Sequence, residues 1–251
     1  MDDLQLQLLL DLHQSNLRQG PGGDTESKRA MELAGLDRSR RLKIADLGCG
    51  TGASSLLLAQ QLDADIMAVD FLQEFLDELQ VRAVRQGVAD KITTLNCSMD
   101  ALPFEEAEFD VIWSEGAVYN LGFETGISAW RRFLKPGGKL VVSEITWLNG
   151  SRSQEIQSHW ESEYPEIDVA SAKIQQLEQH GYSLEGYFVL PMECWLENYY
   201  RPMQRQFDAF LDRHAHSDEA KAIVDAERHE IALYEEYCHD YSYGFYVAKK
   251  V

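Results

Sequence analysis

Three glycines, Gly48, Gly50 and Gly52, stand at alternate positions directly after the short apolar run 44–47. Glycine has no Cβ and tolerates positive φ, so the backbone can turn sharply here and come close to a ligand. A run of helix-forming residues from 53 to 62 follows, and its first N–H groups would point toward the same place. This spacing predicts a ligand-binding turn between a strand and a helix.

Two carboxylates flank this turn. Asp46 lies two residues before the first glycine, and Asp70 ends the next apolar run. An acid after a second strand can accept hydrogen bonds from both hydroxyls of a ribose. Gly48, Gly50 and Ala53 also satisfy the pattern of dinucleotide-binding loops, but a carboxylate at position 46 would face a pyrophosphate unfavourably. The same carboxylate suits a ligand that carries an ammonium and a sulfonium group.

The pattern Asp46-x-Gly48-x-Gly50-x-Gly52, with Asp70 after the second strand, resembles the first motif and the following acid of class I S-adenosylmethionine-dependent methyltransferases. Within that family the chain resembles uncharacterised small-molecule methyltransferases of bacteria and archaea. The resemblance implies that S-adenosylmethionine is the methyl donor. It also implies that Asp70 binds the ribose and that Asp46 lies near the methionine ammonium.

Three further segments resemble the same family. In segment 96–104, Met99 would pack on the adenine and Asp100 would accept from its exocyclic amine. Segment 109–116 resembles the fourth strand and the loop beside the methionine moiety, and the Arg-Gln-Gly-Pro-Gly-Gly segment 18–23 would fold over that end as a lid. The resemblance assigns the following residues to S-adenosylmethionine binding: Arg18, Gly20, Asp46, Gly48, Gly50, Gly52, Asp70, Phe71, Ser98, Met99, Asp100, Ser114 and Glu115.

Methyl transfer from a sulfonium requires few catalytic groups from the protein. The sulfonium already activates the methyl carbon, so the enzyme must chiefly align the acceptor, the methyl carbon and the sulfur. A general base is needed only for an acceptor that is protonated. The catalytic residues are therefore unknown, and a packing or surface role explains each candidate equally well. The candidates by position are His13, Glu115, Tyr119, Tyr199 and Tyr200.

Apolar runs alternate with amphipathic helical segments along much of the chain. This alternation predicts an α/β fold with a doubly wound, mostly parallel sheet. The resemblance adds a Rossmann-like sheet of seven strands with an antiparallel last strand. The expected strands are 42–47, 64–69, 91–95, 109–114, 139–145, 182–190 and 243–249. The expected helices are 4–18, a second one capped by Asp24 or Thr25, 53–62, one after Asp70, 125–134, 171–180, 194–214 and 217–238.

These elements suggest three parts. Residues 1–40 would form an N-terminal helical lid, and residues 41–190 with 241–251 the S-adenosylmethionine-binding domain. Residues 191–240 would be a helical insertion on the acceptor side, before the last strand. The aromatic side chains of the insertion suit a cationic or planar acceptor, whereas Arg201 would suit a carboxylate.

Charge and composition restrict the partners. The net charge of −19, from 23 basic and 42 acidic residues, opposes binding to nucleic acid. No apolar run is long enough to span a bilayer, and the acidic start of the chain lacks the basic region of a signal peptide. The 4 cysteines are far apart, which argues for free thiols in the cytoplasm and against a metal site. The oligomeric state stays open, a homodimer included.

The sequence therefore predicts a cytoplasmic methyltransferase that uses S-adenosylmethionine on a small-molecule acceptor. N-, O- and C-methylation stay open, and an amine acceptor is favoured. One alternative is an oxidoreductase that binds a nicotinamide dinucleotide, against which Asp46 argues. The other is a binding protein that keeps the S-adenosylmethionine pocket without catalysis.

Overall fold

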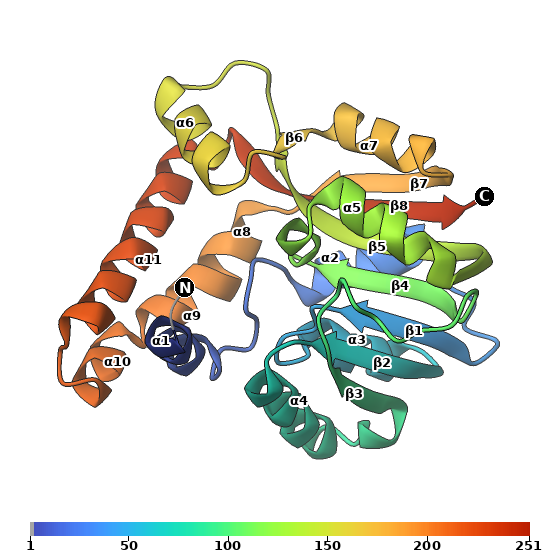
Figure 1. The fold of residues 1–251 in the computed structure, drawn as a ribbon, viewed down its shortest axis with the longest axis horizontal. Helices are drawn as coiled ribbons and strands as arrows, with labels where there is room; N and C mark the ends of the chain where they lie inside the picture. The colour runs from blue at the N-terminus through green and yellow to red at the C-terminus, as the bar shows by residue number, and fades with distance from the viewer. Residues whose placement is uncertain (1–2) are drawn as a thin grey trace.

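The computed structural model describes residues 3–251, and its centre is one mixed β-sheet (Figure 1). The strands are β1 (Leu42–Leu47), β2 (Ala64–Asp70), β3 (Ile92–Asn96), β4 (Phe109–Glu115), β5 (Leu134–Trp147), β6 (Asp168–Val169), β7 (Tyr182–Val189) and β8 (Tyr241–Lys250). Their order in the sheet is β3-β2-β1-β4-β5-β8-β7, and β6 pairs with β5 outside this path.

The first five strands and β6 run parallel, and β8 runs in the opposite direction. β1 pairs in parallel with β2 and β4, β2 pairs with β3, and β4 pairs with β5. β8 runs antiparallel to both β5 and β7. The predicted Rossmann-like sheet with an antiparallel last strand is thus confirmed. The sequence does not indicate the two-residue strand β6, because so short a segment carries no periodic pattern.

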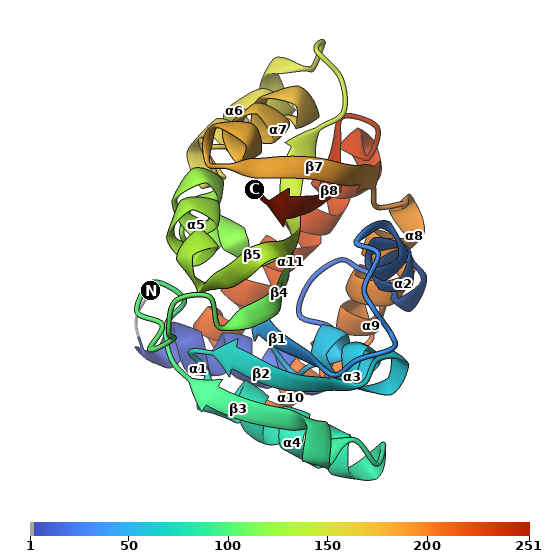
Figure 2. The same ribbon diagram turned by 90° about the vertical axis from the view of Figure 1, so that its right-hand side faces the viewer.

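Helices cover both faces of this sheet and gather beside one of its edges (Figures 1 and 2). The helices are α1 (Asp3–His13), α2 (Asp24–Leu33), α3 (Ala53–Gln61), α4 (Gln73–Arg85), α5 (Phe123–Trp130), α6 (Gln154–Glu163), α7 (Ala170–Gln179), α8 (Met192–Trp195), α9 (Arg201–Gln204), α10 (Phe207–Arg213) and α11 (Asp218–Tyr237). Short 3₁₀ turns lie at Ala89–Lys91, Val118–Asn120 and Arg131–Phe133, and a π-helical turn, η4, lies at Leu196–Tyr200.

Alternate residues of each parallel strand are buried on opposite faces of the sheet. In β1, Ile44 belongs to the apolar core that includes α3 residues, whereas Ala45 and Leu47 belong to the core under α5. Figure 2 shows α5 and α7 on one side of the sheet and α2 and α3 on the other. Strands buried on both faces need nearly continuous apolar sequence, which is why the parallel strands were visible in the sequence.

Helices from the two ends of the chain form one packed group beside the sheet. Leu8 and Leu12 of α1 share an apolar core with Phe210 of α10 and Val224 of α11. Asp11 of α1 also pairs with Arg213 through its Oδ2 at 2.7 Å. The N-terminal helix and the insertion therefore stabilise each other (Figure 1).

The N-terminal helices differ from the prediction at their ends. α1 ends at His13 and not at residue 18, because the carbonyls of Gln14 and Asn16 accept hydrogen bonds from the Arg82 guanidinium and do not continue the helix. α2 is capped by Gly23, without a side-chain hydrogen bond. The prediction that Asp24 or Thr25 caps this helix is therefore wrong.

Two further helix boundaries were predicted wrongly. The helix expected to reach Leu134 ends at Trp130, since Leu134 already pairs with Phe109 as the first residue of β5. The helix expected over 194–214 is divided into α8, η4, α9 and α10. Pro202 at the start of α9 has no N–H to donate to the preceding turn, which favours the wider π-helical turn there.

The glycine-rich loop adopts the conformation that its sequence predicts. Gly48, Gly50 and Gly52 have φ values of 73°, 54° and 90°, a region in which other residues are strained. Gly52 is the N-cap of α3. A Cβ added at Gly52 would lie 2.0 Å from Cδ1 of Leu79, which is fully buried. The loop thus packs directly against α4.

Gly52→Ala is expected to lower the free energy of unfolding by roughly 2–4 kcal/mol, through backbone strain and overpacking together. Gly87→Ala is the matched control, because Gly87 also has a positive φ, 69°, but nothing lies within 4 Å of an added Cβ. The control should lose only about 1 kcal/mol. Urea unfolding followed by circular dichroism measures both values. Equal losses in the two variants would contradict the close packing of Gly52 on α4.

Candidate functional site

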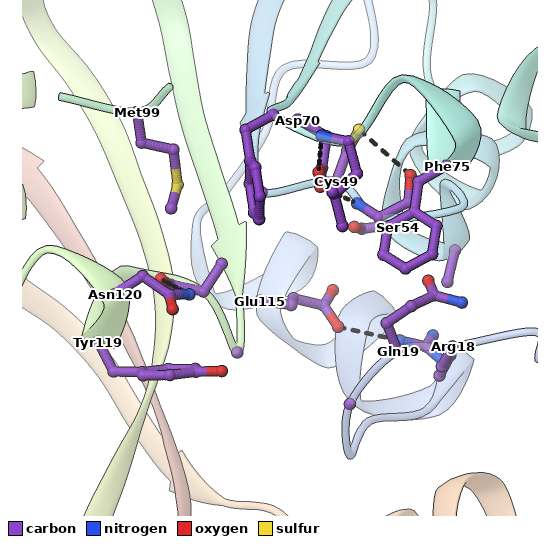
Figure 3. A pocket seen from close by; sticks show the side chains of 18 of the residues that line it. Arg18, Gln19, Cys49, Ser54, Asp70, Phe75, Met99, Glu115, Tyr119 and Asn120 are labelled. Atoms are coloured by element: carbon purple, nitrogen blue, oxygen red, sulfur yellow. Dashed lines mark hydrogen bonds and ion pairs between the residues drawn. The ribbon is translucent and has the colours of Figure 1, made fainter. Parts of the chain in front are cut away.

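A cavity of about 510 Å³ opens at the carboxyl ends of the parallel strands. It lies where the strand order reverses between β1 and β4, the usual position of ligands in such sheets. The loops after β1, β2, β3 and β4 line it, together with the segment between α1 and α2 (Figure 3). The predicted site residues that line it are Arg18, Gly20, Gly48, Gly50, Asp70, Phe71, Ser98, Met99, Glu115 and Tyr119.

Asp70 holds the glycine loop and faces the cavity. Its Oδ2 accepts from the Gly50 N–H at 2.8 Å, and its Oδ1 accepts from the Leu72 N–H at 3.0 Å. The residue is 7% exposed, and burial raises the pKa of its carboxyl. Each carboxylate oxygen keeps a second lone pair, so Asp70 can accept from a pair of neighbouring hydroxyls without releasing the loop.

Asp46 lies beneath the loop and does not line the cavity. It is 0% exposed, and its Oδ2 accepts from the hydroxyls of Ser54 at 3.0 Å and Ser55 at 2.6 Å. Its buried Oδ1 has no hydrogen-bond partner. Burial, together with the Glu115 and Asp70 carboxylates, raises the pKa of Asp46 to about 7. A cation bound nearby would favour the ionised form of this group.

Glu115 connects β4 to the N-terminal segment. Its Oε1 accepts from the Ser27 hydroxyl at 2.6 Å and the Trp113 indole at 2.9 Å, and its Oε2 accepts from Arg18 at 3.1 Å (Figure 3). Arg18 also donates to Asp24 at 3.1 Å. Although burial opposes the shift, these two carboxylates raise the pKa of Arg18. The Arg18–Glu115 pair thus holds the segment against the cavity.

Two residues that sequence reasoning missed fix the same segment. The Gln19 Oε1 accepts from the Thr51 N–H at 2.8 Å and from its hydroxyl at 2.9 Å, while Nε2 donates to the carbonyls of His13 and Asn16. Arg82 of α4 donates to the Asn16 carbonyl at 2.9 Å and the Thr51 hydroxyl at 2.8 Å. The only sequence signal for Gln19 was its position within the proposed lid segment. Arg82 had no signal in the sequence, because it lies on an ordinary amphipathic helix.

Other predicted binding residues lie outside the cavity lining. Gly52 caps α3. Ser114 is 0% exposed and donates to the Leu47 carbonyl at 2.8 Å, which ties β4 to β1. Asp100 follows Met99, but only Met99 reaches the lining. Gly52 and Ser114 thus support the walls of the cavity, and Asp100 is an exposed residue outside its lining.

The catalytic candidates divide into two groups. Tyr119, which is 39% exposed, and Glu115 line the cavity. His13 lies instead at the end of α1, with its Nε2 3.3 Å from the Glu227 carboxylate. Tyr200 is 0% exposed and donates its hydroxyl to a carboxylate of α11 at 2.9 Å. His13 and Tyr200 are therefore separated from the cavity lining.

Among residues 3–251, no group of three or more His, Cys, Asp or Glu side chains could hold a metal ion. Cys49, Cys97, Cys194 and Cys238 are free thiols. Within the same range, no helix is both long and apolar enough to cross a bilayer.

Residues 44–138 match a family model described as a methyltransferase domain. The malonyl-[acyl-carrier protein] O-methyltransferase of Herminiimonas arsenicoxydans is 35% identical over 126 residues, which are 50% of this chain and 43% of that protein. The phosphoethanolamine N-methyltransferase of Triticum aestivum is 23% identical over 188 residues, 74% of this chain and 35% of that protein. The similarity thus spans less than half the length of either relative.

Solved structures of similar fold include enzymes with different reactions. An S-adenosylmethionine-dependent methyltransferase from Geobacter sulfurreducens, solved with S-adenosyl-L-homocysteine, matches with a TM-score of 0.85 at 16% identity, over 98% of both chains. The [4+2]-cyclase SpnF matches with a TM-score of 0.75 at 21% identity, over 99% of this chain and 93% of that one. At these identities the likeness establishes the fold, and the reaction must be argued from the site.

Asp46→Asn is expected to change how stability depends on pH. Because the folded state raises the pKa of Asp46 from 3.8 to about 7, the wild type loses stability as pH rises between these values, and no further above them. Asparagine resembles the protonated carboxyl and can still accept from both serines. The stability of the variant relative to the wild type should therefore increase across this interval, by up to about 1.4 kcal/mol per pH unit.

Urea unfolding at a series of pH values from about 5 to about 8 measures this difference. Asp63→Asn, at an exposed position just before β2, is the control and should follow the wild type. A stability difference between Asp46→Asn and the wild type that does not vary with pH would show that Asp46 does not titrate as a buried carboxyl.

Proposed function

We propose that this chain, whose residues 44–138 match a family model described as a methyltransferase domain, transfers the methyl group of S-adenosylmethionine to a small-molecule acceptor. The observation that carries the proposal is the grouping of Asp46, Asp70 and Glu115 around one glycine loop. Three carboxylates there repel a pyrophosphate and attract a sulfonium and an ammonium. The S-adenosyl-L-homocysteine complex of the Geobacter sulfurreducens protein supports the same donor.

The contacts already described support one orientation of the donor. Asp70 accepts from both ribose hydroxyls, and Met99 packs on the adenine. The methionine ammonium lies toward Asp46 and Glu115. Arg18 has five N–H donors, so it can donate to the methionine carboxylate while it keeps Glu115. The segment from Arg18 to Gly23 then acts as a lid over this end.

The reaction is a single displacement at carbon. A lone pair of the acceptor forms a bond to the methyl carbon while the carbon–sulfur bond breaks and its electron pair returns to sulfur. The sulfonium becomes the neutral thioether of S-adenosylhomocysteine, and a proton of the acceptor, where it has one, leaves to a base or to water. The protein contributes alignment and exclusion of water more than bond chemistry.

An amine is the acceptor that we favour, on the side of the cavity that faces residues 191–240. A relative that methylates phosphoethanolamine and a net charge of −19 both support a cationic acceptor over nucleic acid. Arg201 donates to Gln204 and pairs with Glu235. Because its guanidinium is already engaged, the alternative that Arg201 binds a carboxylate acceptor is weakened.

Two alternatives predict different experimental results. An oxidoreductase would bind a nicotinamide dinucleotide, which a titration with NADH detects directly. The second alternative is a binding protein without catalysis. The occurrence of the same fold in a [4+2]-cyclase means that the fold alone does not decide for methyl transfer. Formation of S-adenosylhomocysteine from S-adenosylmethionine with a panel of primary, secondary and tertiary amines tests the proposed activity. No turnover across a broad acceptor panel would favour the binding protein.

Asp70→Ala should weaken the binding of S-adenosylhomocysteine by roughly tenfold to a hundredfold, because charge-assisted hydrogen bonds to the ribose are lost. Isothermal calorimetry measures the affinity, and circular dichroism monitors whether the loop variant remains folded. Asp77→Ala, which removes an exposed carboxylate of α4, is the control and should bind like the wild type. Unchanged affinity in Asp70→Ala would disprove the assignment of Asp70 to the ribose.

Gln19→Ala tests the lid. The variant loses two hydrogen bonds to Thr51, so opening becomes easier and bound S-adenosylhomocysteine should dissociate roughly tenfold faster. Stopped-flow fluorescence measures the dissociation rate. Gln14→Ala, at an exposed position of the same segment, should leave it unchanged. Gln19→Ala is a sharper test of the lid than deletion of residues 1–23, because the deletion would also remove Leu8 and Leu12 from the core. An unaltered rate in Gln19→Ala would argue against a lid.

A further inference from the structure

Glu230 of α11 is accessible to solvent and at the same time joined to the core of the protein. Its Oε1 accepts from the hydroxyl of Tyr200 at 2.9 Å, and Tyr200 is 0% exposed, whereas Glu230 itself is exposed. Burial, with a further contribution from the Glu227 carboxylate, raises the pKa of Glu230 to about 7. The contact with a fully buried tyrosine and the raised pKa together favour a place in a recess of the protein over one on the outer surface of the helix.

Tyrosine rings from separate elements surround the same space. Tyr199 and Tyr200, on the π-helical turn, have ring centroids 5.1 Å apart. Burial, with contributions from Tyr119 and Glu230 among other groups, raises the pKa of Tyr243 on β8. Burial and, among others, Glu230 and Tyr119 likewise raise the pKa of Tyr199. The ring contacts agree with these effects, because the Trp195 ring lies 5.9 Å from that of Tyr200 and 5.2 Å from that of Tyr243.

This space adjoins the donor cavity. Gly116 and Tyr119 both line that cavity, and a Cβ added at Gly116 would lie 3.7 Å from Cζ of Tyr243. Figure 3 shows the Tyr119 ring projecting from the loop after β4 toward the open space in front of Glu115. Tyr119 and Tyr243 therefore form the boundary between the two spaces.

The basic side chains near Glu230 are paired with other carboxylates, so the surroundings of Glu230 carry a net negative charge. His13 is paired with Glu227 at 3.3 Å, and Lys173 is paired with Glu144 at 3.2 Å. Glu230 has no such basic partner among the described ion pairs. The buried Nδ1 of His13 and Oε2 of Glu227 lack hydrogen-bond partners. The titratable groups that act on or respond to Glu230 are Glu227 of its own helix, His13 of α1, Glu163 of α6, Tyr199 and Tyr200 of η4, Tyr241 and Tyr243 of β8, and Tyr119.

We propose that this recess is the acceptor site and that it selects a cationic amine, with the Glu230 carboxylate as the counter-charge and tyrosine faces as the walls. Aromatic faces and a single anion, away from bulk water, are the combination that holds an ammonium group. The inference rests on the proposed function, because only a bound donor gives the adjoining recess an acceptor to hold. Glu230 recognises and positions the acceptor, and no bond-making step is assigned to it.

The test uses two probes of the same shape, choline and 3,3-dimethylbutan-1-ol, which differ in that a carbon replaces the charged nitrogen. Choline serves as a mimic of a fully methylated amine product. Calorimetry with the full chain in the presence of saturating S-adenosylhomocysteine should show choline binding roughly tenfold more tightly than the neutral alcohol. Glu230→Gln should abolish most of this preference.

The variant is chosen so that the fold is kept. Glutamine can still accept from the Tyr200 hydroxyl through its Oε1, so the change removes the charge and little else. Glu236→Gln makes the same change in charge at an exposed position of the same helix and should retain the choline preference. The affinity of both variants for S-adenosylhomocysteine alone should equal that of the wild type.

The dependence on pH provides a second readout, since choline itself does not titrate. Because the Glu230 carboxyl has a pKa of about 7, the affinity of the wild type for choline should rise as pH increases through neutrality and the carboxyl ionises. The rise should be smaller in Glu230→Gln. The alcohol should show no comparable rise, because it carries no charge.

The outcomes separate the two proposals. If S-adenosylhomocysteine binds but choline and the alcohol bind equally well, or if Glu230→Gln keeps the wild-type preference and pH dependence, the assignment of the recess is overturned and the proposed function survives. If S-adenosylhomocysteine does not bind to the wild type, the proposed function fails. Loss of the choline preference in Glu230→Gln alone, with donor affinity unchanged, supports the recess as the site of a cationic acceptor.

Discussion

The hydrogen bond from the Gly50 N–H to the Asp70 carboxylate, 2.8 Å long, is the contact around which the cavity is built. It joins the loop after β1 to the end of β2. The N–H groups of Gly48 and Cys49 donate to the Val69 carbonyl at 2.9 and 3.0 Å, so three consecutive residues of the loop are attached to one neighbouring strand. The parallel register that pairs Leu47 with Val69 makes these contacts possible. Contacts within the protein therefore define the shape of the loop.

This arrangement places negative charge where water cannot stabilise it. Ser54 and Ser55 donate to one oxygen of Asp46, while the other oxygen has no partner. Glu115 lies close enough to raise the pKa of Asp46 further, after burial itself. A ligand with a positive charge relieves both the repulsion and the desolvation, whereas an anionic ligand adds to them. The buried carboxylates around the glycine loop thus favour a cationic ligand over an anionic one.

The sequence was sufficient for the elements that carry a local signal. β1, β2 and β4 are apolar runs buried on both faces, and the glycine loop has a spacing that few other structures require. Asp70 could be identified because its place after the second strand is fixed by topology. These elements therefore predicted the strand-end loops that line the cavity and some of the residues in them.

The remaining contacts have no local signal. Gln19 meets Thr51 across a sequence separation of 32 residues, and Arg82 meets Asn16 across 66. Nothing in the neighbouring residues distinguishes such side chains from solvated ones. Glu230 is a stronger example, because α11 also carries Glu227 and other acids that resemble an ordinary polar face. Which acid faces inward is decided by packing against η4 and α1, and packing of distant segments cannot be derived from periodicity.

The segments that enclose the two spaces are parts of one helical group. His13 of α1 holds Glu227, one turn from Glu230, and Gln19 a few residues later holds the glycine loop through Thr51. The chain between these residues is short, so it connects the segment that we propose as a lid to the helix that carries Glu230. If that segment closes on the donor, it would also hold α1 against α11, and with it the carboxylate that we propose for the acceptor. The proposed acceptor site would then be complete only with the donor bound, so the donor would bind first.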